Sequence, residues 1–471
     1  MTGMSEITIT EDTATRSATS SPWSYGLIAI AAALLAGVMG LRGGRDAADA
    51  EWYGMIAQGH MQSVLEPFAS RQLEARSVEA LVALVPMGVD RGFALLALLS
   101  TLVCVGGAGY MLYRANVPAP LFAAAALLPV WAAFDHAYML PDIFFSALLM
   151  LFLVCLWRKS YWLAAGMLFP LYIAREATVL VLLCFLIAGV RILRARVMAG
   201  AALAAGAGAL VTHYLASGSD SNRHNLPALV YLLAKVPYNL AKNVFGVQLW
   251  SNTITLGEPP YWTWRVPAGL HLGAIKVIGI CPFHLHFLYS TLLCWMGAFG
   301  VLPLLLYIAL RQGRFEGARS DLLMRFCLLY GLISFAIGPL LGASVYRLVL
   351  QGWPAFLVAL PLCWPNAETV KLVQSLPRSG SADPRVWGPR LVIDRTEEPR
   401  TPKPGVRATQ LVGFHTSLIP VNLLCGWVSA AAVGILSRGE GRDYAWAGLI
   451  VVVACWVFTY RKSNVTARES A

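Results

Sequence analysis

The chain has 471 residues, of which 58% are hydrophobic and 13% charged, and its mean hydropathy is +0.62. Soluble domains carry about 45–50% apolar and about 25% charged residues, so the composition excludes disordered, collagen-like and disulfide-rich classes and indicates a membrane protein. The net charge of +11 comes from 36 Lys and Arg against 25 Asp and Glu. Without a soluble basic face, this excess indicates basic membrane loops and no nucleic-acid partner.

Apolar runs separated by short polar turns follow one another along most of the chain. Several have only about 15–17 residues, the short limit for a bilayer span, but each is expected to form a helix. The Gly206-Ala-Gly208 run predicts close packing against a neighbouring helix. The predicted fold is an all-α polytopic membrane protein with about 12 transmembrane helices. Its apolar runs lie at residues 25–42, 91–113, 119–134, 141–157, 160–174, 176–192, 197–216, 287–310, 322–341, 346–364, 413–437 and 444–460.

The orientation is predicted from Lys and Arg, which gather in cytoplasmic loops. Basic turns follow alternate spans, around Arg158, Arg191 and Arg311, and the segments 365–412 and 461–471 are also basic. All of them fall on one side when both termini are cytoplasmic, so we expect a multi-pass protein of the inner (plasma) membrane. Its predicted parts are a disordered cytoplasmic tail (1–24), a transmembrane module (25–364), a cytoplasmic linker (365–412), a C-terminal two-helix hairpin (413–460) and a cytoplasmic tail (461–471).

Two long segments, 42–90 and 217–286, interrupt the pattern on the predicted outer side. Both contain short amphipathic stretches, such as 78–85 and 229–236, which are expected to be helices lying along the membrane surface. The aromatic loop 257–267 is either an interfacial belt or a set of flat platforms for sugar rings.

Ionisable side chains close to a bilayer core are costly, so each is a candidate functional residue. On the predicted topology, acids and bases from four separate outer turns converge at the outer membrane face. Structural alternatives stay open, because acids also cap helix starts and Arg175 with Glu176 also suits a local turn. Arg347 lies beside an apolar run, where an unpaired guanidinium is expensive, and this position favours a function. The candidates are Asp46, Asp49, Glu51, Arg71, Asp135, His136, Asp142, Arg175, Glu176 and Arg347.

The order of these motifs and their common side resemble the GT-C superfamily of membrane glycosyltransferases. This superfamily includes protein O-mannosyltransferases, oligosaccharyltransferases and lipid A aminoarabinose transferases. The resemblance covers roughly residues 25–365, and an Asp-x-Glu here replaces the family's adjacent Asp-Glu pair, so Asp46, Asp49 and Glu51 stay alternatives for the functional acid. The matching motifs are Asp49-Ala-Glu51-Trp-Tyr53, Pro67-Phe-Ala-Ser-Arg71, Leu140-Pro-Asp142, Ala174-Arg175-Glu176 and Tyr346-Arg347.

The resemblance implies transfer of a sugar from a polyprenyl-phosphate donor to a hydroxyl of a glycan, lipid or protein acceptor. Asp49 would be the general base, and arginines would hold the leaving phosphate, Arg347 as first choice and Arg175 as second. The remaining substrate-binding candidates are Glu51, Arg71, Asp142 and Glu176. No cofactor is expected, and a divalent cation has no support in the sequence.

Two other classes of protein stay open as alternatives. A secondary transporter would carry polar residues at the bilayer midplane, broken helices and paired repeats, none of which the sequence shows. A non-catalytic membrane scaffold of cell-envelope assembly would tolerate neutral residues in place of its outer carboxylates.

Overall fold

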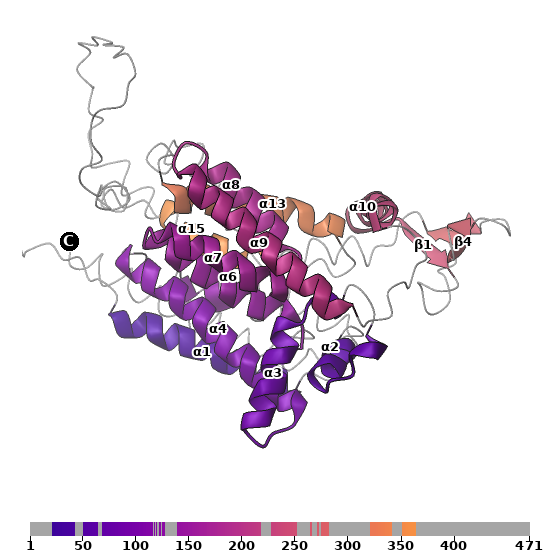
Figure 1. Cartoon of the computed structure of the whole chain (residues 1–471), viewed down its shortest axis with the longest axis horizontal. Coiled ribbons are helices and arrows are strands. Elements are labelled where there is room, and N and C mark those ends of the chain that lie inside the picture. The colour runs from indigo at the N-terminus through magenta and orange to yellow at the C-terminus, as the bar shows by residue number, and fades with distance from the viewer. Residues whose placement is uncertain are drawn as a thin grey trace, which may run out of the picture.

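The computed structural model describes residues 21–42, 50–64, 68–115, 139–217, 228–251, 264–265, 271–272, 275–281, 321–341 and 351–363, with single positions between 117 and 127. These residues are mostly helical (Figure 1). The predicted spans 287–310, 413–437 and 444–460 and the predicted linker 365–412 lie outside the described residues.

The predicted apolar runs coincide with helices wherever those runs are well described, to within a few residues at most ends. Two of these helices, α4 and α9, are long and apolar enough to cross a membrane. Proline at the first position of α6 fits a helix start, since that residue's N–H has no partner there in any case. The helices are α1 (Pro22–Arg42), α4 (Val89–Arg114), α6 (Pro141–Trp157), α7 (Tyr161–Ala174), α8 (Thr178–Gly189), α9 (Ala195–Ala216), α13 (Leu322–Leu341) and α15 (Trp353–Cys363).

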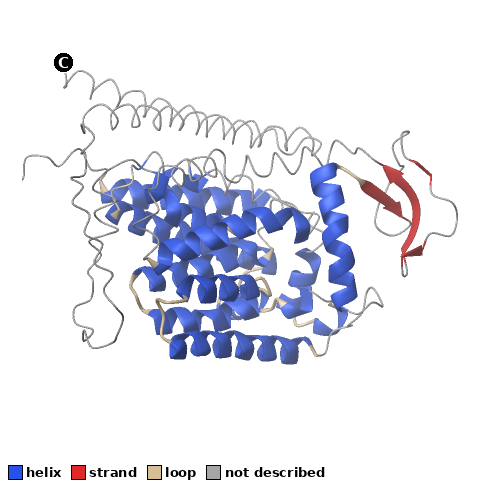
Figure 2. Ribbon diagram, turned by 90° about the horizontal axis from the view of Figure 1, so that it is seen from above, coloured by secondary structure: helices blue, strands red, loops and turns tan. Residues whose placement is uncertain are grey.

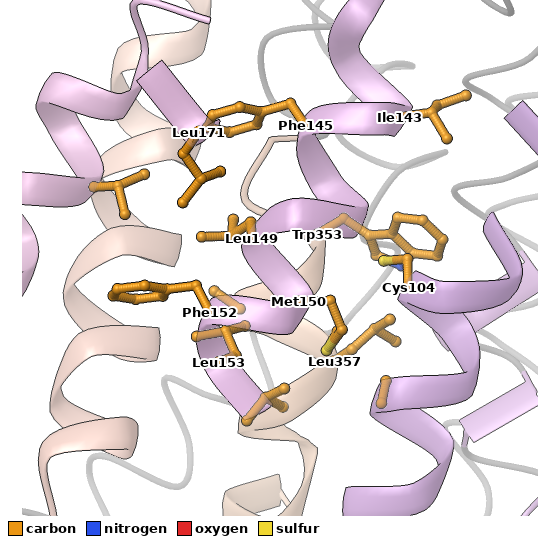
Figure 3. Packing of buried hydrophobic residues seen from close by; sticks show 14 of the residues in the cluster. Cys104, Ile143, Phe145, Leu149, Met150, Phe152, Leu153, Leu171, Trp353 and Leu357 are labelled. Carbon is orange, nitrogen blue, oxygen red and sulfur yellow. The ribbon is translucent and has the colours of Figure 1, made fainter. Parts of the chain in front are cut away.

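These helices form a bundle, which Figure 2 shows from above. Within it α6 contacts α4, α7, α13 and α15. Figure 3 shows the side chains of Leu149, Met150 and Leu153 among those of neighbouring helices, and all three are fully buried. The indole of Trp353, at the start of α15, donates a hydrogen bond to the carbonyl of Ala125 at 3.1 Å. The residues of α6 are apolar around most of the helix, and this pattern suits a helix that packs against neighbours on several sides.

Two of the helices are followed by a basic residue whose backbone lies in the left-handed region. Lys159 follows α6 with φ 57°, and Arg191 follows α8 with φ 70°. Glycine usually takes such positions, because a side chain there is strained. A positive charge at the carboxyl end of a helix compensates in part by favourable interaction with the helix dipole. Both residues belong to the basic turns that predict the cytoplasmic side.

The first predicted outer segment contains α2 (Ala50–Ala57), two short 3-10 turns (Met61–Ser63 and Phe68–Ser70) and α3 (Leu73–Leu84). The predicted amphipathic stretch 78–85 lies almost wholly within α3. The side chains of Trp52 and Phe68 stack with ring centres 6.2 Å apart, which ties the second 3-10 turn to α2.

The described residues fit the predicted all-α fold in being mostly helical, but the second predicted outer segment differs from the prediction in part. It contains α10 (Ala228–Phe245), which includes the predicted stretch 229–236, but a small antiparallel sheet follows where only short helices were expected. In this sheet β4 pairs with each of the other strands. Ile and Val favour the extended chain of β4, and strands of two to four residues are too short to give an alternating pattern. The strands are β1 (Gln248–Ser251), β2 (Trp264–Arg265), β3 (His271–Leu272) and β4 (Ile275–Cys281).

The close helix packing predicted at Gly206-Ala-Gly208 is confirmed at Gly208 and wrong at Gly206. A Cβ atom on Gly208 would lie 2.9 Å from the carbonyl oxygen of Phe169 and 2.8 Å from Cβ of Tyr172, both on α7. A Cβ atom on Gly206 would meet nothing within 4 Å. Of these two glycines, Gly208 is therefore the one that lets α9 approach α7 closely.

We expect Gly208→Val to destabilise the chain by about 1–3 kcal/mol, because the added atoms must push α7 and α9 apart. Gly206→Val is the matched control, since it makes the same change in the same helix without a neighbour to displace. The measurement is the thermal unfolding midpoint of both purified variants in detergent. Equal midpoints would contradict the packing seen at Gly208.

Candidate functional site

Polar and charged side chains from four separate parts of the chain meet at one end of the bundle. Asp142 lies in the first turn of α6, Arg175 directly follows α7, and Gln351 precedes α15. Arg71 and Glu74 lie at the start of α3, in the first predicted outer segment. We call these residues, together with Tyr53 and Glu176, the polar cluster.

The innermost part of the polar cluster is the ion pair between Arg175 and Asp142. The guanidinium donates a hydrogen bond to the carboxylate, and both side chains are about 95% buried. The Gln351 amide, oriented to satisfy the hydrogen-bond network, accepts from both terminal nitrogens of Arg175 at 3.1 and 3.2 Å. Burying a charge is expensive unless it is paired and hydrogen-bonded, and these contacts supply both conditions.

A second ion pair lies closer to the surface. Arg71 donates from Nε to Glu176 Oε2 at 2.8 Å and from a terminal nitrogen to the other carboxylate oxygen, so the contact is bidentate. It also donates to the hydroxyl of Tyr53 at 3.4 Å. Burial would raise the pKa of Glu176, but the charge and hydrogen bonds of Arg71, with the charge of Arg175, lower it to about 2. The Glu176 side chain is 47% exposed, so solvent weakens the energy of this pair.

Glu74 lies beside the inner ion pair and differs from the other acids of the polar cluster. It is only 1% exposed, and within the described part of the chain its Oε2 has no hydrogen-bond partner. Burial and the negative charge of Asp142 raise the pKa of the Glu74 carboxyl well above its usual range, and Arg175 offsets only part of this effect. Glu74 is therefore a candidate neutral acid, able to donate a hydrogen bond as well as accept one.

The structure brings together four of the residues that the sequence predicts for the site: Arg71, Asp142, Arg175 and Glu176. Glu51 lies in the first turn of α2 and is exposed, outside the polar cluster. The predicted residues Asp46, Asp49, Asp135, His136 and Arg347 lie outside the described residues.

Glu74 and Gln351 were missed by the sequence analysis. Glu74 begins an amphipathic helix, where an acid has an ordinary capping role, and Gln351 carries no charge. The available signal for Glu74 was its place three residues after Arg71, which puts both side chains at the same helix start.

We expect Glu74→Gln to make the chain more stable than the wild type at neutral and alkaline pH, and equally stable near pH 4. The folded chain holds the Glu74 proton more tightly than the unfolded chain. Wild-type stability therefore falls, by up to about 1.4 kcal/mol per pH unit, as pH rises from the unfolded pKa towards the raised folded one. The Gln side chain does not ionise, so the stability of the variant does not fall for this reason as pH rises.

The measurement is the thermal midpoint of both proteins between pH 4 and pH 9. Glu79→Gln is the control, because Glu79 lies on the same helix with its side chain 41% exposed and paired with Arg76. Parallel curves for the wild type and Glu74→Gln would show that folding does not raise the pKa of Glu74.

The polar cluster holds two cations, two anions and one candidate neutral acid, so its charges are nearly balanced. Among the described residues, no three His, Cys, Asp or Glu side chains come close enough together to hold a metal ion. Hydrogen bonds and arginine charges are thus what this part of the chain offers a ligand. No protein-family model, curated protein or solved structure matches the chain.

Proposed function

We propose that the chain is an integral membrane glycosyltransferase, which moves a sugar from a polyprenyl-phosphate donor to an acceptor hydroxyl at the outer face of the membrane. The observation that carries the proposal is the polar cluster, where Arg71, Asp142, Arg175 and Glu176 meet at one end of an apolar bundle. The end of a set of membrane spans lies where the bilayer meets water, and the reactive bond of a lipid-borne sugar phosphate lies at this depth too. The GT-C resemblance predicts these residues at its site.

The proposed membrane location is a multi-pass arrangement of about 12 spans in the inner membrane, with both termini in the cytoplasm. It is supported by the two long apolar helices and by apolar side chains of α9 that face outwards, such as Leu203 and Leu210, which are 74% and 72% exposed. The cluster residues also lie at the helix ends that the sequence predicts to be outside. At helix ends predicted to be cytoplasmic, burial raises the pKa of Asp321, and the backbone N–H of Leu323 and the positive charge of the nearby Lys159 offset part of this rise.

In the proposed reaction, the acceptor hydroxyl loses its proton to a carboxylate, for which Asp49 is the first choice, and attacks the anomeric carbon. The bond from that carbon to the phosphate oxygen breaks, and the phosphate leaves as an anion that arginine stabilises. Arg347 remains the first choice for stabilising the leaving phosphate. Arg175 is already engaged with Asp142 and Gln351, so we assign it the task of holding the Asp142 carboxylate in position.

The positions of the buried charges favour a transferase over a transporter. A transporter places ionisable groups near the bilayer midplane. Within the described ranges, the buried Asp, Glu, Lys and Arg side chains are Glu74, Asp142, Arg175 and Lys242. All four lie in a predicted outer segment or at the outer end of a helix.

The experiment is transfer by the purified full chain in liposomes supplied with polyprenyl phosphate that carries radiolabelled mannose, glucose or aminoarabinose. Lipid, polysaccharide and protein fractions of a cell envelope are offered as acceptors. We expect one donor to be consumed, with release of polyprenyl phosphate and label in one fraction, which identifies the acceptor class. If a folded chain consumes none of the donors, the transferase proposal fails.

A further inference from the structure

Helix α10 has the reverse polarity of a helix on a water-soluble protein. Among residues 236–245, whose side chains the structure describes, the buried ones are Asn239, Lys242 and Asn243, which are 1–7% exposed. Its apolar residues Val236, Leu240, Val244 and Phe245 face outwards, and their exposures are 37%, 38%, 39% and 59%. Within each set, members lie three or four residues apart along the helix, so each set forms a continuous face.

The buried polar face is explained by what it covers. Asn239 donates from its amide nitrogen to the carbonyl of Leu340 at 3.0 Å. Leu340 lies in the last turn of α13, where carbonyls have no partner within the helix. The polar face of α10 thus caps the end of α13, which the sequence predicts to be the outer end of a span.

The orientation of α10 fits a place along the membrane surface. Figure 1 shows α10 nearly end-on beside the bundle, whereas α4 and α9 are seen lengthwise, so α10 runs across these two helices. The turned view of Figure 2 shows α10 lengthwise, next to the strands. A helix across the end of a set of spans lies in the plane of the membrane. A helix face in contact with water usually carries polar side chains, so the outward apolar face of α10 is not the face expected in water.

We propose that α10 is an interfacial helix, whose face of Val236, Leu240, Val244 and Phe245 contacts the lipid acyl chains of the outer leaflet. The inference rests on the membrane location proposed above but not on the transferase activity. Composition supports lipid as the occupant, because α10 carries no acidic residue that anionic headgroups would repel. The helix leads directly into β1, so it holds the small sheet close to the membrane surface.

The test is the accessibility of a nitroxide spin label on the full chain in vesicles of phosphatidylethanolamine and phosphatidylglycerol. The label is attached through a ketone-bearing amino acid, since the chain has nine cysteines. It is placed at Leu240 and at Val244 in separate variants, and at Gln58, an exposed residue after α2, as the control. Lipid-soluble oxygen and a water-soluble nickel chelate are the two collision partners.

We expect oxygen collisions to exceed chelate collisions several-fold at Leu240 and Val244, and the reverse at Gln58. Chelate collisions that dominate at Leu240 and Val244 would place the face in water and overturn the proposal. Exclusion of both reagents would show that protein covers the face, which also overturns it. A chain that alkaline carbonate strips from the vesicles would instead overturn the proposed membrane location itself.

Discussion

Replacing Arg175 by methionine should destabilise the chain by about 3–5 kcal/mol, because it leaves the Asp142 carboxylate buried without its cation. Asp142 and Arg175 are each about 95% buried, so solvent cannot replace the lost partner. Burial and the charge of Asp142 raise the pKa of the neighbouring Glu74, and the loss of Arg175 removes the charge that partly offsets this rise, so Glu74 should stay protonated in the variant. The loss should shrink at low pH, where the Asp142 carboxylate can take up a proton. Thermal unfolding of the purified variant in detergent at several pH values measures both effects.

Two further variants separate the buried pair from the general cost of removing an arginine. Arg76→Met breaks a pair whose side chains are 38% and 41% exposed, and it should cost about 1 kcal/mol or less. The double variant Arg175→Met with Asp142→Leu removes both buried charges and should recover most of the lost stability. If the double variant is as unstable as Arg175→Met alone, the instability comes from lost packing and not from the unpaired charge.

The sequence predicted the positions of the helices because their apolar runs are long and end at polar turns. The run 141–157 and helix α6 coincide, for example. The meeting of Asp142 and Arg175, 33 residues apart, follows from the same pattern. Two consecutive helices joined by the short basic turn at Arg158 run in opposite directions, so the start of α6 and the end of α7 lie at the same end.

Other features depend on contacts that a pattern does not contain. Gln351 joins the polar cluster because α15 starts beside Arg175, and an uncharged residue next to an apolar run gives no signal of this. The outward apolar face of α10 was visible as amphipathicity, but the sequence does not say which face turns inwards. That choice depends on the end of α13, which lies about 100 residues further along the chain and offers its carbonyl to Asn239.

Replacing Asp49 by asparagine should reduce sugar transfer by about 10²–10⁴-fold, which corresponds to a rise of roughly 3–5 kcal/mol in the activation barrier. Asparagine keeps the size of the side chain but cannot accept the proton of the attacking hydroxyl. Asp49 immediately precedes α2 in the sequence, and Tyr53 of α2 accepts a hydrogen bond from Arg71. In the sequence, the proposed base thus lies four residues before a member of the polar cluster.

Binding of the donor should survive in Asp49→Asn, because in the proposed reaction arginine, and not the base, holds the phosphate. Arg347→Ala should show the opposite behaviour, with weaker donor binding, since the phosphate loses a charge partner. Asp46→Asn and Glu51→Gln are the controls, because both acids lie within three residues of Asp49 in the sequence. Loss of transfer in one of these controls, with wild-type transfer in Asp49→Asn, would move the base to that residue. Wild-type transfer in all three would leave the reaction without a general base among the acids after the first span, and the proposed mechanism would be wrong.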